Sequence, residues 1–93
     1  MSKDIDNRRE VEITLDFPVQ LADRKLEKVV MRRPRLSDLL AAPIRDLNDL
    51  DGEMRLYARL CNLVPDEIQE LDMADYGKIQ EQYLLFRGEA KQK

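Results

Sequence analysis

The first part of the chain alternates between polar and apolar residues. Side chains on a β-strand point to opposite faces in turn, so the alternation over residues 10–17 predicts a half-buried strand. Its expected buried face consists of Val11, Ile13, Leu15 and Phe17. Pro18 follows directly and has no amide hydrogen. We therefore expect it to end the donation of backbone hydrogen bonds from this strand to its neighbour.

A second strand is predicted from Leu26 to Arg33. Val29 and Met31 share one face in this register, whereas Val30 falls among the charged residues of the other face. The connection over residues 20–25 has no Asn-Gly or Asp-Gly pair, which predicts an antiparallel hairpin with a longer loop. Two strands alone are marginally stable, so the apolar face of the hairpin needs helices packed over it.

Helical spacing replaces the alternation after Pro34. Apolar residues at positions 36, 39, 40, 44 and 47 indicate a helix, and Pro43 interrupts it because proline lacks a backbone donor. We therefore expect a kinked or two-part helix from Leu36 to Leu47, capped by Ser37 or the residue before it. Asp38 then falls in the first turn, where the helix dipole favours an acid.

The widest apolar arc belongs to residues 51–64, DGEMRLYARLCNLV. On a helix, one line of apolar side chains consists of Leu50, Met54, Tyr57, Cys61 and Val64. The neighbouring line consists of Leu56, Leu60 and Leu63. The polar remainder consists of Arg55, Arg59 and Asn62. One packing neighbour needs a stripe of only about 100°, so this wider arc predicts a central helix with contacts on two sides. Glu53 points into the arc, either as a first-turn carboxylate favoured by the helix dipole or as a buried polar contact to a partner or to the strands.

A short turn and a last helix complete the pattern. Pro65 suits the first position of the turn, which Ile68 and Leu71 anchor. Asp72 is the expected cap of the last helix, and Gly88 ends it. The buried stripe of this helix is expected to be Tyr76, Ile79, Tyr83 and Phe86. These patterns predict an α+β fold, an N-terminal antiparallel β-hairpin followed by three to four helices packed on it.

The composition is that of one small soluble domain. With 93 residues the chain has room for a single core, which we assign to residues 10–87, between disordered tails at 1–9 and 88–93. No apolar run is long enough to cross a membrane, and residues 1–10 lack the apolar core of a signal peptide. The single cysteine fits a reducing cytoplasm.

Candidate chemistry is sparse. The chain has no histidine, the usual general base and the commonest metal ligand, so a Cys–His nucleophile is excluded and Cys61 is interpreted as a small buried hydrophobe. The three glycines are too dispersed for a phosphate-binding loop. Asp46, Asp49 and Asp51 resemble the start of a calcium loop but lack its glycine and late glutamate, so we assign them to a linker. We expect no enzyme, cofactor or metal.

The one basic segment surrounds Pro34 and contains Arg32, Arg33 and Arg35. Two interpretations remain open, of which we favour the first: a solvated strand end that balances nearby acids, or the phosphate ligands of a small DNA-binding regulator. The net charge of −3 and the absence of interleaved aromatic residues argue against nucleic acid as the main partner.

The order of these signals resembles a known family. The strand VEITLDFP, then VVMRRPRLSDLL, is similar to a strand ending in Leu-Arg-x-Pro followed by an Asp-Leu helix, and YARLCNLVPDEIQELDMADYGKIQEQYLLF completes the pattern over residues 11–86. Together they resemble the small tail assembly chaperones of contractile-tailed phages, the protein E family of Mu-like phages. The matching positions are Val29, Met31, Arg32, Pro34, Asp38, Leu39, Leu60, Leu63, Pro65, Ile68, Leu71, Asp72, Asp75 and Tyr76. Cys61-Asn62 stands where the pattern has a Thr-Gly-like pair.

The resemblance implies a non-catalytic protein of the bacterial host cytoplasm, encoded by a phage or a phage-tail-like bacteriocin. It implies binding to helical segments of the tape-measure protein, which stays soluble until the tail tube polymerises around it. The tail tube protein and a second copy of this chain are further candidate partners, and no membrane partner is expected. Our candidate contact residues lie on the last helix: Met73, Leu84, Leu85 and Phe86.

Overall fold

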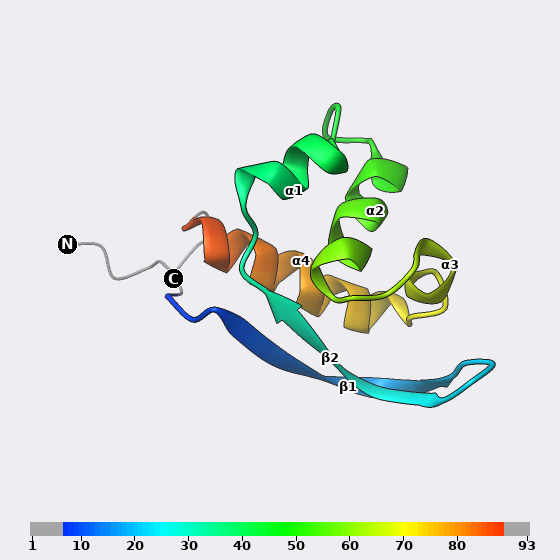
Figure 1. The fold of residues 1–93 in the computed structure, drawn as a ribbon. Helices are drawn as coiled ribbons and strands as arrows, with labels where there is room; N and C mark the ends of the chain where they lie inside the picture. The colour runs from blue at the N-terminus through cyan, green and yellow to red at the C-terminus, as the bar shows by residue number, and fades with distance from the viewer. Residues whose placement is uncertain (1–6, 89–93) are drawn as a thin grey trace.

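The computed structural model describes residues 7–88, so the predicted tail segments at 1–6 and 89–93 lie outside the described residues. A two-stranded antiparallel sheet consists of β1 (Glu10–Gln20) and β2 (Lys25–Arg32). Four helices follow in the described part: α1 (Leu36–Ala41), α2 (Leu50–Leu60), α3 (Pro65–Ile68) and α4 (Met73–Arg87). In Figure 1 the hairpin runs along one side of α4 and the other helices lie along its opposite side. The predicted α+β fold is confirmed.

The hairpin pairs as the alternation predicts over its first half. Val11 faces Met31 and Ile13 faces Val29, and all four side chains are buried. On the outer face, the Lys28 ammonium lies 2.7 Å from the Glu12 carboxylate. The hairpin loop spans residues 21–24, between the two strands, in agreement with the longer connection expected.

The second half of β1 differs from the prediction at two residues. Pairing is irregular between Thr14 and Val19 and then resumes, so the strand continues past Pro18 instead of losing its ladder there. Phe17, expected on the buried face, is 56% exposed. The cause lies in α4: the backbone amides of Asp16 and Phe17 leave the ladder and donate to the Asp75 carboxylate at 2.8 and 3.0 Å.

The helix predicted over residues 36–47 is only half correct. The helix α1 ends at Ala41, and the expected second part is a non-helical connection in which Leu47 is fully exposed. This connection packs against the start of α2, where a Cβ on Gly52 would lie 2.6 Å from the carbonyl oxygen of Pro43. The close approach of the two backbones therefore requires glycine at position 52.

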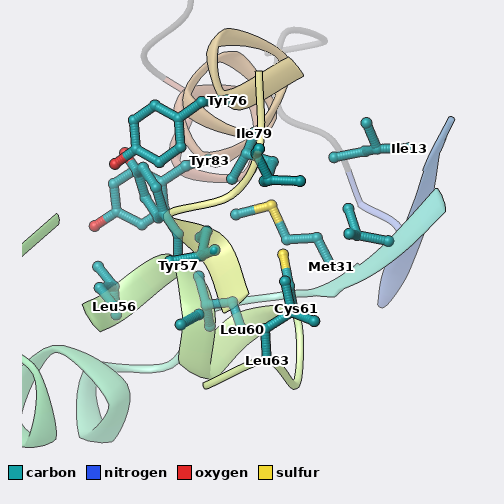
Figure 2. Packing of buried hydrophobic residues seen from close by; sticks show 14 of the residues in the cluster. Ile13, Met31, Leu56, Tyr57, Leu60, Cys61, Leu63, Tyr76, Ile79 and Tyr83 are labelled. Atoms are coloured by element: carbon teal, nitrogen blue, oxygen red, sulfur yellow. The ribbon is translucent and has the colours of Figure 1, made fainter. Parts of the chain in front are cut away.

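The core lies between the hairpin, α2 and α4. Leu56, Leu60 and Ile79 are at most 1% exposed, and Figure 2 shows Met31 reaching from β2 into this cluster. Tyr57 of α2 packs its ring against the rings of two α4 residues, Tyr76 and Tyr83, with centroids 5.7 and 5.2 Å apart. The prediction of a central helix that packs on two sides is confirmed for the middle of α2.

The two ends of the expected arc are exposed. Leu50 is 57% exposed and Val64 is 55% exposed, because α2 ends at Leu60 and the chain then turns. Asn62 has a left-handed φ of 56°, which asparagine tolerates better than most residues. Glycine would meet the same backbone requirement.

The boundaries of α3 and α4 follow their capping signals. Pro65 is the first residue of α3, and Ile68 and Leu71 are buried beneath this turn. Asp72 caps α4 by accepting a hydrogen bond from the Ala74 amide at 2.8 Å, and Gly88 ends the helix with a φ of 76°.

Candidate partner-binding surface

The last helix has a buried side and an exposed side. The buried side consists of Asp75, Tyr76, Ile79, Gln82, Tyr83 and Phe86. At about 100° per residue, Met73, Gly77 and Leu84 fall on the opposite side. Met73 is 80% exposed and Leu84 is 38% exposed, so apolar surface is left uncovered there.

The structure separates the four residues predicted to bind a partner. Phe86 is 4% exposed and carries the Arg33 guanidinium over its ring at 5.1 Å, so it belongs to the core and is not open to a partner. Leu85 is half-buried. Met73 and Leu84 are exposed but lie about 16 Å apart along the helix axis. Their role as partner contacts stays a prediction, and only these two present open side chains.

A groove adjoins Met73. It has a volume of about 130 Å³ and is bounded by α2, by α3 with the turn that follows it, and by α4. Its lining is mostly apolar: Leu50, Met54, Ile68, Gln69, Leu71, Met73, Tyr76 and Gln80. Leu50 and Met73 are more than half exposed, whereas Ile68 and Leu71 are buried. The groove thus has an apolar base and two apolar side chains open to solvent.

Sequence reasoning missed this groove because Leu50 and Met54 continue the buried arc of α2. Their helical positions continue those of buried neighbours, but Leu50, the first residue of α2, is more than half exposed. Leu47 and Leu50, both exposed, stand just before and at the start of that helix.

Glu53 fixes the α4 wall of the groove. Its carboxylate accepts hydrogen bonds from the Tyr76 hydroxyl at 2.7 Å and from the Gln80 amide at 2.9 Å. The structure shows a polar contact to α4, and not to a partner or to the strands as that interpretation had it. Glu53 also lies in the first turn of α2, as the other interpretation expects. Burial, together with this carboxylate, raises the pKa of Tyr76. The tyrosine therefore stays a neutral donor, and two groove residues are held in place.

The basic segment is mostly committed to the fold. Arg32 binds the Asp38 carboxylate through both terminal nitrogens, at 2.6 and 2.8 Å. Arg33 donates to the carbonyl oxygen of Phe86 at 3.1 Å. Together with Arg9 and Arg35 they line a surface cleft. The contacts of Arg32 and Arg33 hold the end of the hairpin to α1 and α4. Because these guanidinium groups already have partners within the fold, the contacts argue against a phosphate-binding role for this segment.

Asp38 was expected as a first-turn acid, but it is 2% exposed. Its carboxylate also accepts from the Arg59 guanidinium at 2.7 Å and from the Arg35 amide at 2.8 Å. Hydrogen bonding by Arg32, more than any other contact, holds the pKa of Asp38 well below its usual value. Arg59, expected on a purely solvated face, thus joins α2 to α1.

The described residues offer little chemistry beyond binding. Burial raises the pKa of the Cys61 thiol to about 12, so it is not an activated nucleophile. Asp49 caps α2 through the Gly52 amide at 3.0 Å, which confirms its linker role. Over residues 7–88 no group of three metal-ligating side chains occurs, and no helix there is long and apolar enough to span a membrane.

The comparisons with known proteins point to one family. The sequence model described as phage tail assembly chaperone proteins, E, or 41 or 14, matches residues 12–87. The matched range runs from β1 to the end of α4, so it includes the groove and the exposed side of α4. No curated protein and no solved structure matches the chain significantly.

Proposed function

This chain belongs to the phage tail assembly chaperone family, and from that premise we propose that it binds the tape-measure protein. It keeps that long chain soluble in the host cytoplasm until tail tube subunits polymerise around it. The same role fits a phage or a phage-tail-like bacteriocin. The tail tube protein and a second copy of this chain remain further candidate partners.

The observation that carries the proposal is the groove between α2, α3 and α4. A helical protein waiting for assembly exposes amphipathic helices, whose apolar stripes aggregate unless they are covered. An amphipathic helix can bury such a stripe in an apolar groove, using side chains at helical spacing as anchors. Leu50 and Met73 are exposed at this groove and can cover such a stripe.

The groove is preformed. Ile68 and Leu71 in its lining are buried, and Tyr76 and Gln80 are hydrogen-bonded to Glu53. A preformed surface loses little conformational entropy on binding, which favours affinity. The chaperone activity that follows is stoichiometric covering of apolar surface, and it needs no catalytic group.

The test is co-expression with the tape-measure protein of the same phage or bacteriocin. The wild-type protein should keep the tape-measure protein in the soluble fraction, and Met73→Lys should send it to the pellet. Leu40→Lys is the matched control, because Leu40 is 76% exposed on α1 and does not line the groove. A soluble tape-measure protein with Met73→Lys, or an insoluble one with the wild type, would contradict the proposal.

A further inference from the structure

The three glycines of this chain are not equally explained by its own fold. Gly52 is required because a Cβ there would lie 2.5 Å from the Asp49 carboxylate and 2.6 Å from the Pro43 carbonyl oxygen. Gly88 adopts a left-handed φ of 76°. Apart from its chain neighbours and the nearby backbone of α4, a Cβ on Gly77 would meet no atom of the described residues within 4 Å, and the φ of Gly77 is not positive.

Gly77 nevertheless sits inside α4, where glycine destabilises a helix relative to alanine. Neither space nor backbone conformation in residues 7–88 accounts for it. Glycine is also the residue that lets another backbone come close, because it has no side chain. The unexplained glycine thus points to a contact made outside this chain.

The neighbours of Gly77 on the helix have the spacing of a helix–helix seam. Met73, Gly77, Gln80 and Leu84 follow one another at intervals of four, three and four residues, as in a coiled coil. Met73 and Gln80 also line the groove. This row of residues therefore continues the groove along α4. It projects least from the helix at Gly77, which has no side chain.

Charges at the rim specify the occupant further. Glu70, Asp72 and Glu81 are exposed and adjoin groove residues in the sequence. Two cations are nearby: Arg55 is paired with Asp51 at 2.6 Å, and Lys78 is turned to the hairpin, where it binds Asp16 at 3.1 Å. An acidic rim around an apolar groove complements a helix with basic residues beside its apolar stripe.

We propose that one amphipathic helix with lysine or arginine beside its apolar stripe crosses α4 and comes closest at Gly77. Met73 and Leu84 contact it on either side of that point. The inference rests on the proposed function in that the natural source of this helix is the tape-measure protein. Its central feature, a close backbone approach at Gly77, can be tested without that protein.

The probe is a synthetic helical peptide of about 20 residues, with a leucine stripe flanked by lysines. Its binding to the full-length chain is measured by fluorescence anisotropy. Gly77→Ala should raise the melting temperature of the free chain by a few degrees and weaken peptide binding several-fold. Gly77→Leu should weaken binding by about tenfold or more, as expected for loss of a central contact. The control Leu40→Ala, at an exposed position of α1 outside the groove, should change binding less than twofold.

Wild-type affinity in a folded Gly77→Leu variant would overturn the inference. Equal binding of a peptide with glutamates in place of the lysines would also overturn it, since the acidic rim would then select nothing. Failure of the tape-measure protein to stay soluble with the wild-type chain contradicts the proposed function instead. The two failures are therefore distinguishable.

Discussion

The two sides of α4 are built in opposite ways. The inner side is closed: Ile79 is fully buried, and the Asp75 carboxylate, also fully buried, accepts two backbone amides from β1. The outer side leaves Met73 and Leu84 exposed and has Gly77 where an alanine would stabilise the helix. The difference teaches that one helix holds the fold together with one side and keeps the other available.

This division predicts that substitutions on the two sides of α4 separate stability from binding. Inner-side changes should reduce stability, whereas outer-side changes should weaken the complex without weakening the fold.

Ile79→Ala should lower the free energy of unfolding by about 2–5 kcal/mol, the range for truncating a fully buried aliphatic side chain. Leu84→Ala, on the outer side of the same helix, should change it by no more than about 0.5 kcal/mol. Urea denaturation of both variants checks the pair. Equal losses would mean that α4 buries both sides.

Asp75→Asn should cost about 1–3 kcal/mol, because a buried hydrogen-bond donor is left without an acceptor. The asparagine oxygen can accept the amide of Asp16 or of Phe17, while its own amide group confronts the other. Asp51→Asn is the control, since the Asp51 side chain is 58% exposed. If both variants unfold at the same urea concentration, the bonds from Asp75 to β1 do not stabilise the fold.

Acid should destabilise the protein through the same carboxylate and through Asp38. Burial alone would raise the pKa of Asp75, but the amides of Asp16 and Phe17, with Lys78, outweigh it and lower the pKa. The pKa of Asp38 is also lowered, chiefly by Arg32. A lowered folded-state pKa gives stability that is complete above the unfolded value of about 4 and is lost as the pH falls below it.

Urea denaturation at a series of pH values checks this dependence. The free energy of unfolding should be nearly constant from about pH 7 to 5 and should fall below about pH 4. Asp75→Asn should make that fall shallower. A curve as steep as that of the wild type would exclude Asp75 as a source of the acid sensitivity.

Arg59→Ala should have a smaller effect, about 1 kcal/mol. The Arg59 side chain is 46% exposed, so solvent weakens its ion pair with Asp38, and Arg32 stays in place as a second partner. Arg55→Ala, which breaks a pair exposed on both sides, should stay within about 0.5 kcal/mol. Thermal unfolding of the two variants compares them. Indistinguishable melting temperatures would return Arg59 to the solvated face that the apolar pattern assigned to it.

Local patterns in the sequence were sufficient for the elements and the middle of the core. The alternation over residues 10–15, the middle of the α2 arc and the stripe of α4 each bury the side chains that their period predicts. Asp72 and Gly88 end α4 where their capping chemistry places them. These features depend on neighbours a few residues away, and so the sequence shows them directly.

Long-range polar contacts were not predictable in the same way. Asp75 lies in the first turn of α4, where the helix dipole favours an acid, yet it accepts hydrogen bonds from amides 58 and 59 residues earlier in the chain. That contact turns Phe17 outward and makes β1 irregular. The groove was missed for a related reason, because periodicity places Leu50 on the buried side of α2 without showing where the covering elements end.

Methionine methyl NMR tests most directly whether the partner lies in the groove. Met54 and Met73 line the groove, whereas Met31 is fully buried in the core and serves as an internal control. On addition of the tape-measure protein, or of the basic helical peptide, the methyl signals of Met54 and Met73 should shift while that of Met31 stays in place. Saturating binding that leaves the Met54 and Met73 signals unchanged would contradict the account.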